Sequence, residues 1–130
     1  MSFCTNGLST TGHLIENSNE TGSIQVTVTT LDQIVKNLGV EKINLIKVDI
    51  EGNEHNALVG SKDTLSTFHP ILIIELHTPE QDLLVSKFVR DLVYSIKRID
   101  ESKIENPNET WPNPNGVWGT IICHHPKGNN

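Results

Sequence analysis

One apolar run that ends abruptly in charge, residues 43–52, constrains the fold more than any other part of the sequence. Its bulky and β-branched side chains are Ile43, Leu45, Ile46 and Val48. This pattern predicts a parallel strand that helices cover on both faces. Asp49 and Glu51 follow it, at the carboxyl end of a strand, where open α/β sheets bind their ligands. The alternative is that Asp49 only caps the next helix, because Asp is a favoured N-cap residue.

A second apolar segment, residues 71–76, repeats this arrangement after Pro70. It predicts another buried parallel strand, which ends with Glu75 and has His77 shortly beyond it. Neighbouring strands lie about 4.8 Å apart. We therefore expect Asp49 to lie close to Glu75 and His77 at one edge of the sheet.

Amphipathic helices are expected around these strands. Thr30 is the predicted N-cap of the first helix, Gln33 completes a capping box, and Gly39 ends the helix. Its apolar stripe, which we expect to pack in the core, consists of Leu31, Ile34, Val35 and Leu38. Thr78 and Gln81 form the same kind of box after the second strand. The apolar face of that helix consists of Val85, Phe88, Val89 and Leu92.

The remaining segments complete a single predicted domain, residues 1–130. We expect an alternating strand at residues 24–29, short helices at 53–59 and 61–67, and strands at 94–99 and 117–123. The other parts are a polar N-terminal segment with one or two short strands (1–23), a long loop with Trp111 (100–116) and a frayed tail (124–130). Helical crossovers join parallel strands, so this order predicts an α/β sheet, mostly parallel with an antiparallel last strand.

The motif that closes the first apolar run resembles the signature of FkbM-type methyltransferases. Residues 47–54 have the sequence Lys-Val-Asp-Ile-Glu-Gly-Asn-Glu. Three further segments match that family in the same order: Thr30-Leu31-Asp32, Ala57-Leu58-Val59-Gly60 with Leu65, and Ile74-Glu75-Leu76-His77. The resemblance covers about residues 24–100. It implies a Rossmann-like class I methyltransferase sheet and S-adenosylmethionine as the cofactor.

The glycine-rich turn that holds the methionine end of the cofactor in that family has no counterpart in this sequence. No Gly-x-Gly-x-x-Gly string follows an expected strand. We therefore expect the C-terminal half of the domain, a truncated form in which the cofactor-binding residues stay unassigned and Asp49 is the nearest candidate. The alternative function is a non-catalytic half-domain remnant that serves as an assembly or interaction module. An exposed sheet edge would then favour pairing into a homo-oligomer.

The candidate catalytic residues are Asp49, Glu51, Glu75 and His77. The resemblance implies methyl transfer, and we expect the acceptor to be a hydroxyl group of a small molecule or glycan. His77 titrates near neutral pH and is the candidate base, while Asp49 or Glu51 orients the acceptor or His77. The alternatives are that His77 is a solvated loop residue or a hydrogen-bonding residue at the entry to the next helix, or that Asp49, Glu75 and His77 hold a divalent metal.

Composition argues against several classes of partner. The net charge is −6 and the basic residues are scattered, which disfavours nucleic acid and anionic membrane surfaces. No stretch approaches the ~20 apolar residues of a membrane span, and the N-terminus does not resemble a signal peptide. Cys4 and Cys123 form no Cys-x-x-Cys motif. We therefore expect a reduced, cytoplasmic protein, with a disulfide between these cysteines as the alternative.

Overall fold

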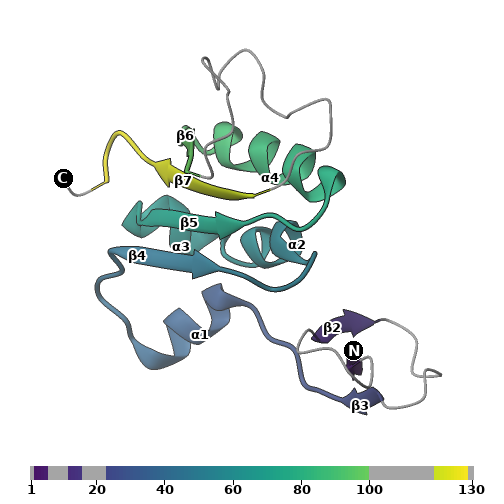
Figure 1. Ribbon diagram of the computed structural model, residues 1–130. Helices are drawn as coiled ribbons and strands as arrows, with labels where there is room; N and C mark the ends of the chain where they lie inside the picture. The colour runs from purple at the N-terminus through teal and green to yellow at the C-terminus, as the bar shows by residue number, and fades with distance from the viewer. Residues whose placement is uncertain (1, 6–11, 16–22, 100–118, 129–130) are drawn as a thin grey trace.

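The computed structural model describes residues 2–5, 12–15, 23–99 and 119–128 (Figure 1). Its elements in chain order are β1 (Ser2–Thr5), β2 (Gly12–Ile15), β3 (Ser23–Gln25), α1 (Leu31–Leu38), β4 (Leu45–Val48), α2 (Glu54–Val59), α3 (Lys62–Phe68), β5 (Ile71–Glu75), α4 (Pro79–Asp91), β6 (Ser95–Arg98) and β7 (Thr120–His124). None of the helices in this part of the chain is long and apolar enough to cross a membrane.

The larger sheet has the strand order β4-β5-β7-β6. β4 and β5 are parallel, with Leu45 opposite Ile71 and Val48 opposite Ile74. β7 is antiparallel to both β5 and β6, so β4, β5 and β6 run in one direction and β7 runs in the other. The predicted parallel pair and the antiparallel last strand are therefore confirmed. The sequence did not indicate that β7 lies between β5 and β6.

The hydrophobic core lies on one face of this sheet. Buried residues alternate with partly exposed ones along β5 and β7, and those on the buried face are Leu72, Ile74, Ile121 and Cys123. Helices α2, α3 and α4 contribute Leu58, Leu65, Val85 and Val89 to the same core. Figure 1 shows α2 and α3 behind the strands.

The prediction that helices cover β4 on both faces is wrong for the described part of the chain. Val48 is buried in the core, but Leu45 is 51% exposed and Lys47 is also exposed. The reason is that the helices of the core all pack against the same face. The other face of β4 is left open.

Helix α1 has the predicted caps. Thr30 Oγ1 accepts a hydrogen bond from the backbone N–H of Gln33 (3.2 Å), and Gly39 ends the helix in the left-handed conformation with φ of 61°. The side-chain amide of Gln33 donates to Asn37 Oδ1 (2.6 Å) instead of returning to the cap. Only the Thr30 half of the predicted capping box is therefore observed.

The apolar stripe of α1 does not pack in the core, contrary to the prediction. No residue of this helix is buried, and Ile34 and Leu38 are 41% and 73% exposed. The 3.6-residue period correctly places the stripe on one side of the helix, where Leu31 and Val35 are half-buried but Ile34 and Leu38 remain exposed.

The N-terminal strands form a separate antiparallel sheet with the order β2-β1-β3. The strand predicted at residues 24–29 is shorter, because β3 ends at Gln25 and residues 26–30 have no regular structure. β3 pairs with β1 and not with β4. β4 is consequently an edge strand within the described part of the chain.

The C-terminal residues pack onto the body of the molecule. After β7, the ring of His125 stacks on His69 with centroids 4.0 Å apart and meets Tyr94 edge-on at 5.0 Å. These contacts anchor the chain, so the predicted frayed tail is wrong for residues 124–128. The predicted loop 100–116, including Trp111, and the first two residues of the predicted last strand lie outside the described residues.

Candidate active site at the ends of two parallel strands

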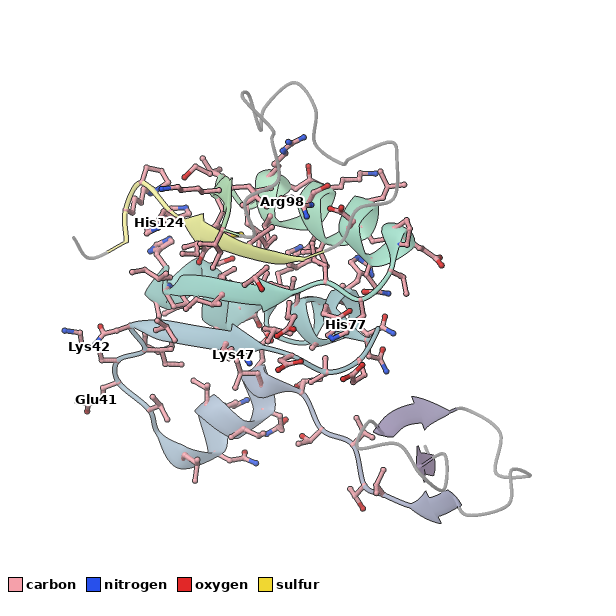
Figure 2. All side chains as sticks on the ribbon, in the orientation of Figure 1. Glu41, Lys42, Lys47, His77, Arg98 and His124 are labelled. Atoms are coloured by element: carbon pink, nitrogen blue, oxygen red, sulfur yellow. The ribbon has the colours of Figure 1, made fainter. Side chains whose placement is uncertain are left out.

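Parallel strands β4 and β5 end at the same edge of the sheet and position the candidate residues there. Beyond β4, the chain turns through two left-handed residues, Glu51 with φ of 54° and Gly52 with φ of 95°, before α2 begins at Glu54. Beyond β5, His77 lies between the strand and α4. Figure 2 shows His77 past the ends of both strands. The two strand-to-helix connections therefore face each other.

All four predicted catalytic residues meet at this edge. His77 Nε2 lies 3.7 Å from Asp49 Oδ1 and 3.6 Å from Glu51 Oε2. Side-chain atoms of Asp49, Glu75 and His77 lie within 4.8 Å of one another. We call Asp49, Glu51, Glu75 and His77 the carboxylate–histidine cluster. Its geometry agrees with the prediction that the strand ends bring these side chains together.

Lys47 is a member of this site that sequence reasoning missed. Its Nζ donates to Asp49 Oδ2 at 2.7 Å and lies 3.9 Å from Glu75 Oε2. The hydrogen bond from Lys47 is the main reason why the pKa of Asp49 is lowered, and the same bond raises the pKa of Lys47. The available signal was the strand period of two, which places residues 47 and 49 on one face.

Asp49 does not cap helix α2, so the capping alternative is wrong. The N-cap of α2 is Asn53, which makes no side-chain capping bond. The carboxylate of Asp49 instead accepts the hydrogen bond from Lys47.

Glu54 is the second residue that sequence reasoning missed. It is the first residue of α2, and its side chain is fully buried. Glu54 Oε1 accepts a hydrogen bond from the N–H of Gly52 (2.8 Å) and lies 2.8 Å from His77 Nδ1. One signal for Glu54 was available, since it closes the family-like motif. Its position in the first turn of a helix offered a simpler explanation, because acidic residues are favourable there.

The pKa of the His77 ring is raised above its ordinary value. Burial of the ring lowers the pKa, but the hydrogen bond and charge of Glu54, together with the charges of Glu51 and Asp49, outweigh it. The folded protein therefore keeps this proton to higher pH than the unfolded chain does. The stability that it contributes is fully present below the unfolded pKa of 6.5 and is lost as the pH rises through the folded pKa.

The same cluster contains the ligand atoms of the metal alternative. Asp49, Glu75 and His77 each offer one ligand atom within 4.8 Å of the others. The ammonium group of Lys47 lies against two of these carboxylates and supplies a positive charge there. A metal ion would have to compete with Lys47, and metal binding stays a prediction.

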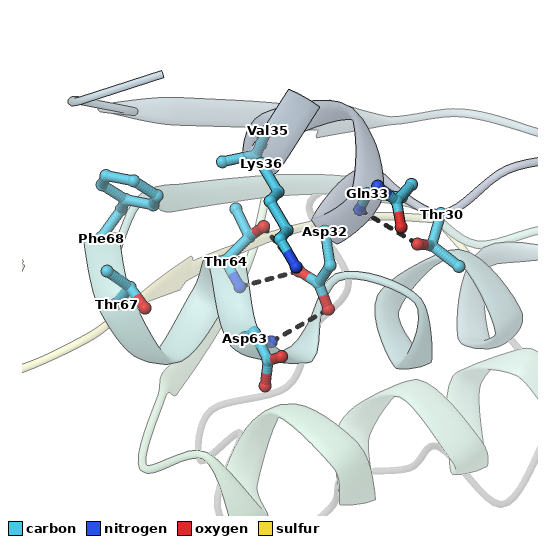
Figure 3. A pocket seen from close by; sticks show the side chains of 9 residues that line it. All are labelled: Thr30, Asp32, Gln33, Val35, Lys36, Asp63, Thr64, Thr67 and Phe68. Carbon is cyan, nitrogen blue, oxygen red and sulfur yellow. Dashed lines mark hydrogen bonds between the residues drawn. The ribbon is translucent and has the colours of Figure 1, made fainter. Parts of the chain in front are cut away.

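A cavity of about 380 Å³ lies between α1 and α3, and no residue of the cluster lines it (Figure 3). Asp32 crosses from α1 to the start of α3, where it accepts hydrogen bonds from the N–H groups of Asp63 (3.1 Å) and Thr64 (2.8 Å) and from Thr64 Oγ1 (2.6 Å). This carboxylate caps α3 from another helix, so we assign it a structural role.

Comparison with known proteins gives a match to a protein family. The family model described as Methyltransferase FkbM domain matches residues 4–98, which include the whole carboxylate–histidine cluster, Lys47 and Glu54. Searches of curated proteins and of solved structures found no match.

Proposed function

The chain belongs to the FkbM methyltransferase family. We propose that it is part of an S-adenosylmethionine-dependent O-methyltransferase and carries the residues that align the acceptor and take its proton. The acceptor that we propose is a hydroxyl group of a small molecule or glycan. The observation that carries this proposal is His77 Nε2, which faces Asp49 and Glu51 at the ends of two parallel strands.

Methyl transfer to oxygen requires an aligned acceptor and a group that takes its proton, and alignment contributes most of the rate. When bound, S-adenosylmethionine supplies the methyl group. His77 Nε2 accepts the hydroxyl proton as the new bond to oxygen forms. Asp49 and Glu51, each within 3.7 Å of this nitrogen, stabilise the imidazolium that results. The cluster is partly open to solvent, and its carboxylates disfavour an anionic acceptor.

The described residues suit the sulfonium group of S-adenosylmethionine but lack the turn that would hold its methionine end. The carboxylates of Asp49, Glu51 and Glu75 suit a sulfonium cation. Among the described glycines, Gly39 and Gly52 have open space beside them, and none belongs to a glycine-rich turn of the kind that the family uses for the methionine end. The common direction of β4, β5 and β6, with β7 opposed, supports our proposal of a Rossmann-like class I sheet.

Transfer of a labelled methyl group from S-adenosylmethionine to a panel of hydroxyl compounds and glycans tests this function. We expect transfer by the chain and a loss of at least about a hundredfold in His77→Gln, which is the usual contribution of a general base. The matched control is His124→Gln, which changes an exposed histidine outside the cluster. Equal transfer by the two variants would remove His77 from the mechanism.

A second candidate function is the non-catalytic assembly module. The observation that favours it is the open edge of β4 together with the exposed side chains of Ile34, Leu38 and Leu45. This alternative predicts no methyl transfer by any variant and self-association through β4. The cytoplasmic location is part of both proposals, and Cys123 is a free, buried thiol.

A further inference from the structure

Glu54 is a buried acidic residue that contacts one backbone N–H and one histidine ring. Its side chain has no exposed surface, and its Oε1 is shared between Gly52 N–H and His77 Nδ1, each at 2.8 Å. Within the described structure, its Oε2 has no hydrogen-bond partner. A buried carboxyl oxygen is costly unless donors are hydrogen-bonded to it, so the two contacts of Oε1 are satisfied when Gly52 and His77 both donate to it.

The hydrogen bonds of Glu54 determine which ring nitrogen of His77 carries the proton. Oε1 already accepts from the backbone N–H of Gly52, and a carboxylate oxygen accepts hydrogen bonds without donating any. The proton in the contact with His77 therefore belongs to Nδ1. In the neutral ring the lone pair then lies on Nε2, the nitrogen that faces Asp49 and Glu51.

We propose that Glu54 is a positioning residue that holds neutral His77 in the tautomer with its proton on Nδ1, so that Nε2 is free to accept a proton. The use of that nitrogen in methyl transfer rests on the proposed function. The tautomer itself depends only on the contact between Glu54 and His77.

The surrounding structure holds both partners in place. The N–H of His55, next to Glu54, donates to Gln81 Oε1 of α4 at 2.8 Å, which ties the start of α2 to α4. The backbone N–H of Leu76, just before His77, donates to the carbonyl of Gly119 at 3.1 Å. The two residues thus sit on segments that are fixed to the rest of the sheet and its helices, as a preorganised site requires.

The carboxylates within 4 Å of the ring nitrogens of His77 come from two segments. Glu54 approaches from α2 at Nδ1, and Asp49 and Glu51 approach from the turn after β4 at Nε2. A carboxylate oxygen of Glu75, at the end of β5, lies within 4.8 Å of His77, and Lys47 Nζ lies 2.7 Å from Asp49 and 3.9 Å from Glu75. Glu51 and Glu54 are therefore a matched pair of carboxylates on opposite nitrogens of one ring.

Nitrogen-15 NMR of the histidine rings of the intact chain tests the proposal. We expect wild-type His77, titrated above its pKa, to carry its proton on Nδ1. In Glu54→Gln, the pKa of His77 should shift down and the Nδ1–H tautomer should lose its dominance, because the amide can donate as well as accept. In the control Glu51→Gln, the pKa should also shift down, while the Nδ1–H tautomer should persist.

Two results would overturn this role for Glu54: an Nε2–H tautomer in the wild-type protein, or an unchanged tautomer and pKa in Glu54→Gln. If Glu54→Gln does not fold, the wild-type protein and Glu51→Gln still decide the question. A dominant Nδ1–H tautomer combined with full methyl transfer by His77→Gln would refute the proposed function and leave the role of Glu54 intact.

Discussion

Asp49 is held at the site by Lys47, and this contact determines what a substitution there should do. Asp49→Asn removes a carboxylate that lies beside His77 without disturbing the core, because the side chain is 38% exposed. We predict loss of methyl transfer and a change in unfolding free energy of less than about 0.5 kcal/mol. Turnover and thermal melts of the same samples measure both.

The control for this prediction is Asp91→Asn, at the exposed end of α4, which should keep both turnover and stability. Normal turnover in Asp49→Asn would mean that Asp49 only partners Lys47.

The sequence predicted which residues form the carboxylate–histidine cluster, but it did not predict the contact between His77 and Glu54. Asp49 and Glu75 could be found because each follows a buried apolar strand, and two parallel strands end at one edge. Glu54 could not be identified as a partner of His77, because their contact depends on the left-handed turn at Glu51 and Gly52. A positive φ at a non-glycine residue such as Glu51 is uncommon, and the sequence contains no sign of it.

Helices α1 and α3 are joined by the three hydrogen bonds that Asp32 accepts at the start of α3. Asp32→Ala removes all of them and leaves the first turn of α3 uncapped. We predict a loss of about 1–2 kcal/mol in unfolding free energy, the usual cost of losing a helix cap. Urea denaturation measures it.

The matched control is Asp91→Ala, for which we expect less than about 0.5 kcal/mol. Equal effects at the two positions would show that water replaces Asp32 as the cap of α3. Methyl transfer should survive in both variants, because neither residue belongs to the cluster.

For the helices, the sequence predicted the residues at their ends reliably, but it did not predict which of their faces are buried. Thr30 and Gly39 predicted the ends of α1, because caps depend on neighbouring residues only. Ile34 and Leu38 predicted an amphipathic helix but not an exposed one. Periodicity states which side chains share a face of a helix, whereas burial depends on what packs against that face.

For the whole molecule, the main consequence is the open edge and face of β4. An edge strand offers unpaired backbone groups, and Leu45 adds apolar surface beside them. We predict that the chain self-associates through this edge and that Leu45→Lys weakens the association at least tenfold. Sedimentation over a range of protein concentrations measures the change.

The control is Leu83→Lys on α4, which adds the same charge at a leucine of similar exposure, 52% against 51%. It should leave the association unchanged. A monomer at every concentration of the wild-type chain would contradict the prediction and, with it, the assembly-module alternative.

The position of β7 makes the order of synthesis differ from the order of strands in the sheet. β6 has β7 as its only sheet neighbour within the described structure, and residues 99–119 separate the two. At roughly 5–20 residues per second, the ribosome needs on the order of seconds to make the intervening chain. Until β7 has been made, β6 and one side of β5 lack their partner in the described sheet. Among the described strands, the one that is made after all the others is therefore the one that joins β6 to the rest of the sheet.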